Sequence, residues 1–170
     1  MAATVSVKQA TGSGPTNTTI TNLRFCTVDA ANDTTNPLVK PSSGTNYSYV
    51  ASVRINADTT PTGTINNVKF YTDGANGYGT GVTVKGITTA SYAQATGTAG
   101  TSGDLSATVY TSGTDIFTYT SASPLAVTGS ISNPSTGIIS NYVAMQVALS
   151  TSVTAGTPSA ETFTFRYDES

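Results

Sequence analysis

Regular alternation of apolar and polar residues is the feature that most restricts how this chain can fold. The clearest runs are Tyr47–Ile55, Ile139–Leu149 and Glu161–Tyr167. In an extended chain, residues two positions apart lie on the same face, so the apolar side chains of each run gather on one side. Each run therefore predicts a half-buried strand, and no stretch shows a helical period of useful length.

Weaker runs of the same kind extend the pattern along the chain. They are Thr4–Gln9, Thr18–Val28, Asn66–Thr72, Val82–Lys85, Leu105–Tyr110, Asp115–Thr120 and Pro124–Ile131. A change of phase inside Thr18–Val28 indicates a bulge or two short strands. The Gly- and Pro-containing connection 150–160 suggests that the last two clear runs form an antiparallel pair. About ten strands separated by turns predict an all-β fold, an antiparallel β-sandwich of immunoglobulin-like or jelly-roll type.

Composition supports ordered sheet. Threonine makes up about a fifth of the chain, and its β-branched side chain suits a pleated, half-exposed strand. Charged residues are only 9% of the chain and the net charge is -2, whereas disordered chains usually carry high net charge. Because no composition shift marks a boundary, we predict one sandwich domain over 18–170, with 1–17 as a flexible N-terminal arm or an edge strand.

The residue types that carry most enzyme chemistry are scarce. Histidine is absent, which removes the commonest general base and the commonest transition-metal ligand. The single Cys26 supplies no zinc cluster and no disulfide within the chain. Paired carboxylates stay open as an acid–base route, although most acids occupy positions typical of turns. The sequence predicts a protein that is not an enzyme and that holds no cofactor and no metal.

Charge and hydropathy also restrict the partners. The seven basic residues are scattered singly, so no nucleic-acid footprint is present. No apolar run approaches the roughly 18 residues of a membrane span, and the first residues lack the pattern of a signal peptide. We therefore expect synthesis in the cytoplasm and no membrane partner. A surface of so little charge favours close contact with neighbours, which suggests a homo-oligomer.

Two tyrosines are the candidate contact residues. Tyr78 lies inside the glycine-rich loop 73–81, and Tyr92 lies just before the glycine-rich loop 96–104. Tyrosine combines a large apolar ring with a polar tip, so it suits stacking on a sugar or anchoring a partner chain. Packing of both rings over the ends of the sandwich is the other interpretation. The site prediction is a partner or glycan contact at Tyr78 and Tyr92.

Several short segments resemble a known group of proteins. They are Ile20–Phe25, Asn46–Tyr49, Ile65–Gly74 and Glu161–Glu169, and they are similar to segments of small β-sandwich virion proteins of tailed bacteriophages. Such proteins are typically capsid decoration or accessory head components. The resemblance implies a structural protein that binds the outer surface of a phage head. The partners of such a protein would be the major capsid protein or other virion subunits. It would be located in the virion after synthesis in the host cytoplasm. The resemblance carries over no catalytic residue.

Two other functions stay open at this stage. One is a carbohydrate-binding or receptor-binding module of a phage appendage or a cell-surface protein, which the absence of tryptophan disfavours. The other is a pilus-like surface subunit, for which an export signal is expected. The oligomeric state, and the choice between head and tail, do not follow from the sequence.

Overall fold

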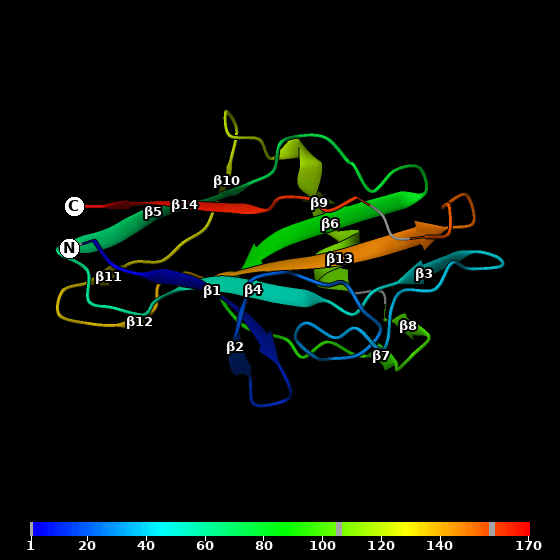
Figure 1. Ribbon diagram of the computed structural model, residues 1–170, viewed down its shortest axis with the longest axis horizontal. Helices are drawn as coiled ribbons and strands as arrows, with labels where there is room; N and C mark the ends of the chain where they lie inside the picture. The colour runs from blue at the N-terminus through cyan, green and yellow to red at the C-terminus, as the bar shows by residue number, and fades with distance from the viewer. Residues whose placement is uncertain (1, 105–106, 157–158) are drawn as a thin grey trace.

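Two antiparallel β-sheets lie face to face and enclose one hydrophobic core (Figure 1). The structure is a computed structural model that describes residues 2–104, 107–156 and 159–170. It is nearly all strand and turn, so the predicted antiparallel β-sandwich is confirmed. Neither helical turn of the described chain is long and apolar enough to cross a membrane.

The larger sheet has β13 at its centre. Its main strands, in spatial order, are β2 (Thr16–Ile20), β1 (Val5–Thr11), β4 (Ala51–Ala57), β13 (Tyr142–Ser150), β6 (Val82–Thr89) and β9 (Thr114–Asp115). Two short strands extend it: β12 (Gly137–Ile138) pairs with β4, and β3 (Thr45–Tyr47) pairs with β13. β1 is paired on both sides, so the structure places an internal strand where the sequence indicated an arm or an edge strand.

The smaller sheet is built around β5 (Thr64–Tyr71). β14 (Thr164–Glu169) pairs with one side of β5, while β10 (Leu125–Ala126) and β11 (Ile131–Ser132) pair with the other. The described residues of β14 have β5 as their only strand partner, so the outer edge of β14 is open. This open edge borders the candidate site described below.

The hydrophobic core fills the space between the sheets. On β4 and β13 the alternate residues Val53, Ile55, Val143 and Met145 point inward and are almost fully buried, as the alternation predicts. From the facing sheet, Phe70 on β5 is 0% exposed and lies edge-on to Phe165, with ring centroids 5.1 Å apart. Aromatic side chains of the smaller sheet and aliphatic side chains of the larger sheet thus form one core cluster.

The prediction that the last two clear strands pair with each other is wrong. β13 pairs with β6, β4 and β3, whereas β14 pairs with β5 in the other sheet. The intervening segment crosses from one sheet to the other instead of forming a hairpin. Alternation reveals which residues are buried, but both inner faces bury the same kinds of residue, so it does not reveal the sheet.

The strand predicted over Tyr47–Ile55 is interrupted, and its outer face is buried. β3 and β4 are separated at Ser48–Val50, and Ser48 is 0% exposed. The backbone N–H of Val147 donates to Ser48 Oγ over 2.9 Å, so the serine side chain takes part in joining the chain to β13. The half-buried strand predicted here is therefore two strands, of which β4 is covered on both faces.

Some of the weaker strand predictions fail or hold only in part. In Leu105–Tyr110, the first two residues lie outside the described residues, and 107–111 form a π-helical turn, η1 (Ala107–Thr111). Half of Asp115–Thr120 is a 3₁₀ turn, η2 (Ile116–Thr118), which the Asp115 carboxylate caps by accepting the N–H of Phe117. Within Thr18–Val28, the strand ends at Ile20, and only Cys26 makes a further bridge.

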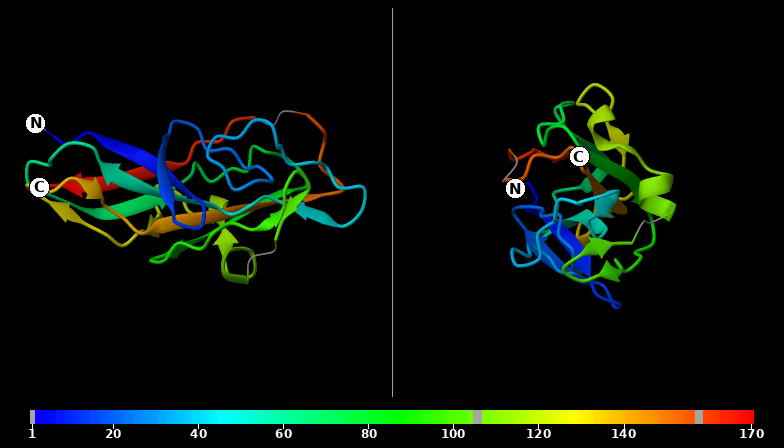
Figure 2. Two further views of the ribbon diagram at one scale, coloured as in Figure 1. Left: turned by 90° about the horizontal axis from the view of Figure 1, so that it is seen from below. Right: turned by 90° about the vertical axis from the view of Figure 1, so that its right-hand side faces the viewer.

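The two termini lie side by side. Figures 1 and 2 show N and C at the same end of the long axis, while the segment 150–156 lies toward the opposite end. The Glu169 carboxylate accepts hydrogen bonds from the backbone N–H groups of Ala3 and Thr62, over 3.0 and 2.8 Å. One side chain therefore links the start of the chain to its end.

Candidate functional site

An open groove with a volume of about 1100 Å³ lies between the two sheets. We call it the inter-sheet groove. One wall is formed by the segments 20–25 and 37–40, and the opposite wall by 153–156 and 159–163. Inner-face residues of both sheets, Val53, Met145 and Phe70, lie on its floor.

The walls of the groove are apolar and only half-buried. The half-buried apolar side chains that line it are Val7, Leu23, Phe25, Leu38, Tyr78, Val82, Leu149, Phe163 and Phe165. Phe25 on one wall and Phe163 on the other meet edge to face, with ring centroids 6.4 Å apart. The groove therefore gathers several incompletely covered apolar side chains on one surface.

Three charged residues line the groove. Arg24 and Lys40 are exposed on one wall, and Glu161 is half-buried on the other. Within the described residues the ion pair that forms is Lys8–Asp58, at 3.6 Å, which lies away from the groove. The positive wall thus faces outward without a carboxylate of the described chain bound to it.

Tyr78 lies in the groove, and its ring packs inward. It meets Phe117 edge to face, with ring centroids 6.2 Å apart. Burial raises the pKa of Tyr78 from its ordinary value of 10.0 to about 12, and the negative charge of Glu161 acts in the same direction. Tyr78 thus contributes a half-buried ring to the lining of the groove.

Tyr92 lies on the other side of the larger sheet. Its ring packs on Tyr142, with centroids 5.8 Å apart, and the guanidinium of Arg54 lies 4.2 Å from the centre of the Tyr142 ring. Burial, followed by the charge of Asp29, raises the pKa of Tyr92 to about 12. The structure therefore places the two predicted contact residues in different sites and does not bring them together.

The raised pKa values predict a loss of stability at alkaline pH. An unfolded tyrosine ionises near pH 10, before the folded Tyr78 and Tyr92, so the stability they contribute is complete below pH 10 and falls as the pH rises toward about 12. Absorbance titration of the folded protein should show late-ionising tyrosines, and Tyr78→Phe and Tyr92→Phe should each remove one. Ionisation of both at pH 10 would contradict the burial described here.

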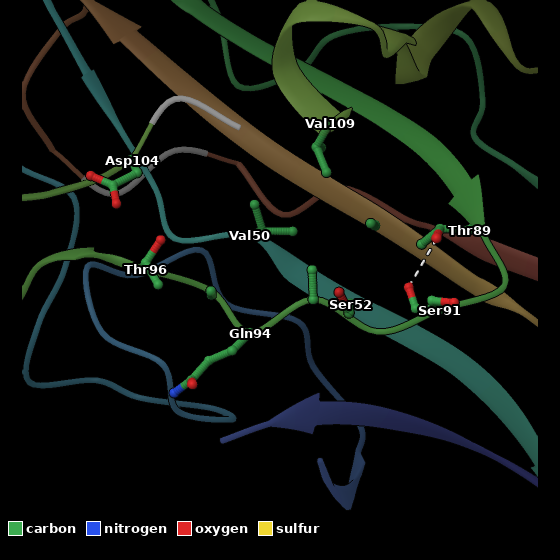
Figure 3. Close-up of a pocket in the computed structure, with 11 residues that line it drawn as sticks. Val50, Ser52, Thr89, Ser91, Gln94, Thr96, Asp104 and Val109 are labelled. Atoms are coloured by element: carbon green, nitrogen blue, oxygen red, sulfur yellow. Dashed lines mark hydrogen bonds between the residues drawn. The ribbon is translucent and has the colours of Figure 1, made fainter. Parts of the chain in front are cut away.

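A second, smaller hollow lies on the outer face of the larger sheet, near Tyr92. Figure 3 shows it between β4, the segment after β6, the chain near Asp104 and the η1 turn, which brings in Val109. Thr89 Oγ1 donates to the carbonyl of Ser91 at its rim, over 2.9 Å. Its volume of about 190 Å³ is below the roughly 300 Å³ at which ordinary small-molecule pockets begin.

The glycine-rich loop 96–104 is docked beside this hollow. It forms the hairpin of β7 (Gly97–Thr98) and β8 (Ser102–Gly103). A Cβ on Gly103 would lie 2.1 Å from the carbonyl oxygen of Ser48, so only glycine permits this close approach. The buried Gln146 side chain donates from Nε2 to the carbonyls of Ser48 and Asp104, over 2.8 and 2.6 Å. The loop is thereby attached to the central strand.

The other glycine-rich loop, 73–81, is a turn structure. The Asp73 carboxylate accepts the backbone N–H of Ala75, and Asn76 Nδ2 donates to the carbonyl of Val82. No group of three or more metal-ligating side chains occurs in 2–104, 107–156 and 159–170. These hydrogen bonds account for the polar side chains of this loop in structural terms.

Comparisons with known proteins give no relative. No protein-family model matches the chain, and no similar protein was found among curated sequences or solved structures. The functional assignment therefore depends on the geometry of the chain itself. In these terms the molecule is an antiparallel β-sandwich with an open, apolar groove between its sheets.

Sequence reasoning singled out Tyr78 but not the groove that it lines. Leu23, Phe25 and Phe163 are the wall residues that it missed as a site, although the alternation around them was recognised. The signal that would have indicated them is a strand-like pattern next to glycine-rich or proline-rich connections, where the chain has no partner strand to pair with.

Proposed function

We propose that this chain is a non-enzymatic structural protein of a bacteriophage virion, a capsid decoration protein that binds the outer surface of the head. The observation that carries the proposal is the inter-sheet groove, since half-buried apolar side chains on a packed sandwich are typical of a surface that binds another protein. The resemblance of several segments to small virion proteins gives the class of partner. The partners would be the major capsid protein or other virion subunits, together with further copies of this chain.

Such a function requires a large contact area and no catalytic residue. A stable protein interface buries about 800 Å² on each partner. Because charged residues are only 9% of the chain, covering its surface removes few charges from water, and desolvation opposes binding only weakly. The carbohydrate-binding alternative is not put forward, since both candidate tyrosines are half-buried against aromatic neighbours.

The test is co-sedimentation of the purified chain with undecorated heads of the phage that encodes it. We expect saturable binding that changes little with salt concentration, because few charges are available to be screened. Isolated tails provide the matched control. Failure to sediment with heads would contradict the decoration function. Binding to tails alone would indicate that the chain is a component of the tail instead of the head.

A further inference from the structure

We propose that the inter-sheet groove accepts an extended strand from a partner protein, with the alternate apolar side chains of that strand pointing into the groove. The inference deepens the proposed function and rests on it for the source of the strand, another virion subunit. Addition of a strand to an open sheet edge is a general mode of peptide recognition. Backbone hydrogen bonds supply affinity in this mode, and pockets for alternate side chains supply specificity.

The first observation is unpaired backbone on both walls. Residues 21–25 and 160–163 belong to no strand, and within the described chain they make no backbone–backbone hydrogen bond. β14, which continues the second wall, is paired with β5 alone among the described residues. Free N–H and C=O groups along a strand edge are a template for pairing with another chain.

The second observation is that both walls carry a strand-like sequence. On one wall Leu23 and Phe25 pack against the core and Arg24 between them is exposed. On the other wall Phe163 and Phe165 pack against the core, and Thr162 beside them is exposed. These walls thus have the alternation of a paired strand without the partner that would complete it.

The third observation concerns the size and chemistry of the space. The groove, at about 1100 Å³, exceeds the roughly 300–1,000 Å³ of ordinary small-molecule pockets. Its floor presents buried apolar side chains from both sheets, Met145 and Phe70 among them. A strand with valine or leucine at alternate positions would cover this surface while its backbone pairs at the open edge.

The charges at the groove define the ends of the strand. Arg24 and Lys40 are exposed on one wall, and no carboxylate of the described residues lies within 4.0 Å of either. An acidic residue at one end of the incoming strand would be favoured beside Arg24 and Lys40 and disfavoured beside Glu161 on the opposite wall, and this difference would set the direction of the strand. The occupant is therefore an extended segment with alternating apolar residues and an acidic end.

The experiment uses the full chain and a short synthetic peptide in which valine and threonine alternate after an N-terminal aspartate. We expect saturable binding, measured by fluorescence anisotropy of the labelled peptide, with shifts of the Met145 and Leu23 methyl signals in NMR spectra. Leu23→Ser and Phe163→Ser should each weaken binding by about tenfold or more. Ile138→Ser, an apolar-to-polar change away from the groove, is the matched control and should bind as the unchanged protein does.

A surface variant keeps the test valid if the wall variants fold poorly. Arg24 is exposed, so Arg24→Glu should leave the thermal unfolding transition unchanged. It should weaken binding of the peptide that begins with aspartate several-fold, and a peptide that begins with lysine should recover the loss. Equal binding of both peptides to Arg24→Glu would overturn the assigned direction of the strand.

Three results would overturn the strand-acceptor site itself. The first is that the alternating peptide does not bind. The second is that a peptide whose amide nitrogens are methylated at the pairing positions binds equally well. The third is that a fluorescent fatty acid binds more tightly and displaces the peptide. Capsid co-sedimentation separates this inference from the decoration function. If Phe163→Ser sediments with heads as well as the unchanged protein does, the decoration function stands and the groove inference fails. If the peptide binds to the chain but the chain does not sediment with heads, the groove inference stands and the decoration function fails.

Discussion

Replacing Phe70 with alanine is expected to lower the free energy of unfolding by about 3–5 kcal/mol. Phe70 is 0% exposed at the centre of β5, and its ring contacts Phe163 and Phe165, with centroids 6.0 and 5.1 Å away. Its removal deletes apolar contacts within the core and leaves a cavity that these neighbours fill only in part. Urea denaturation followed by circular dichroism measures the change.

The control for this variant is Val39→Ala. Val39 is 51% exposed, so its truncation should change the free energy of unfolding by no more than about 0.5 kcal/mol. Since small domains are stable by only about 5–15 kcal/mol, Phe70→Ala should remove a large share of the total stability. A loss below about 1 kcal/mol for Phe70→Ala would show that the smaller sheet does not depend on this ring as described.

Gln146→Leu is expected to cost about 2–4 kcal/mol, although leucine is apolar and similar in size. Gln146 is 0% exposed, and its side-chain amide donates to the carbonyls of Ser48 and Asp104. Leucine supplies no donor, so the buried carbonyl of Ser48 loses a partner and the 96–104 hairpin loses its attachment to β13. Hydrogen exchange should show earlier opening of this hairpin. Unchanged exchange there would contradict the anchoring described.

Gln146→Glu adds a pH signature to the same site. Burial, and the two carbonyl oxygens to which the amide donates, should raise the pKa of the introduced carboxyl in the folded state, because both disfavour its charged form. For a raised folded pKa, stability is complete below the unfolded pKa of about 4.3 and is lost as the pH rises through the folded value. This variant should therefore be closest to the unchanged protein in acid and should lose stability toward neutral pH, whereas the stability of Gln146→Leu relative to the unchanged protein should show no such trend.

The local part of the fold could be predicted from the sequence. Strand alternation has a period of two residues, so the inward positions of β4 and β13, such as Val53 and Met145, are recognisable within a short window. The pairing of β14 with β5 could not be predicted, because it joins residues about a hundred positions apart through features that many strand pairs share. Local patterns determine faces, whereas sheet membership depends on the packing of the whole chain.

The outer face of β13 shows a second limit of the sequence prediction. Gln146 and Ser48 are polar, and polar residues opposite an apolar face usually indicate solvent. In the structure the segment 90–104 and the η1 turn lie over this face, and both side chains are buried with hydrogen-bond partners. Of the candidate site, only Tyr78 was identified in advance. The groove could not be predicted, because it is the space left uncovered between two segments that pair with no strand.

The adjacent termini bear on how the molecule can be used. Because Glu169 holds the beginning and the end of the chain together, a peptide or domain fused to either terminus would emerge from the same end of the sandwich. The wall segment 153–156 belongs to the connection that reaches toward the far end, so a fused cargo would leave this part of the groove accessible. A head decorated through the groove would carry such cargo on its outside, which makes both termini attachment points for surface display.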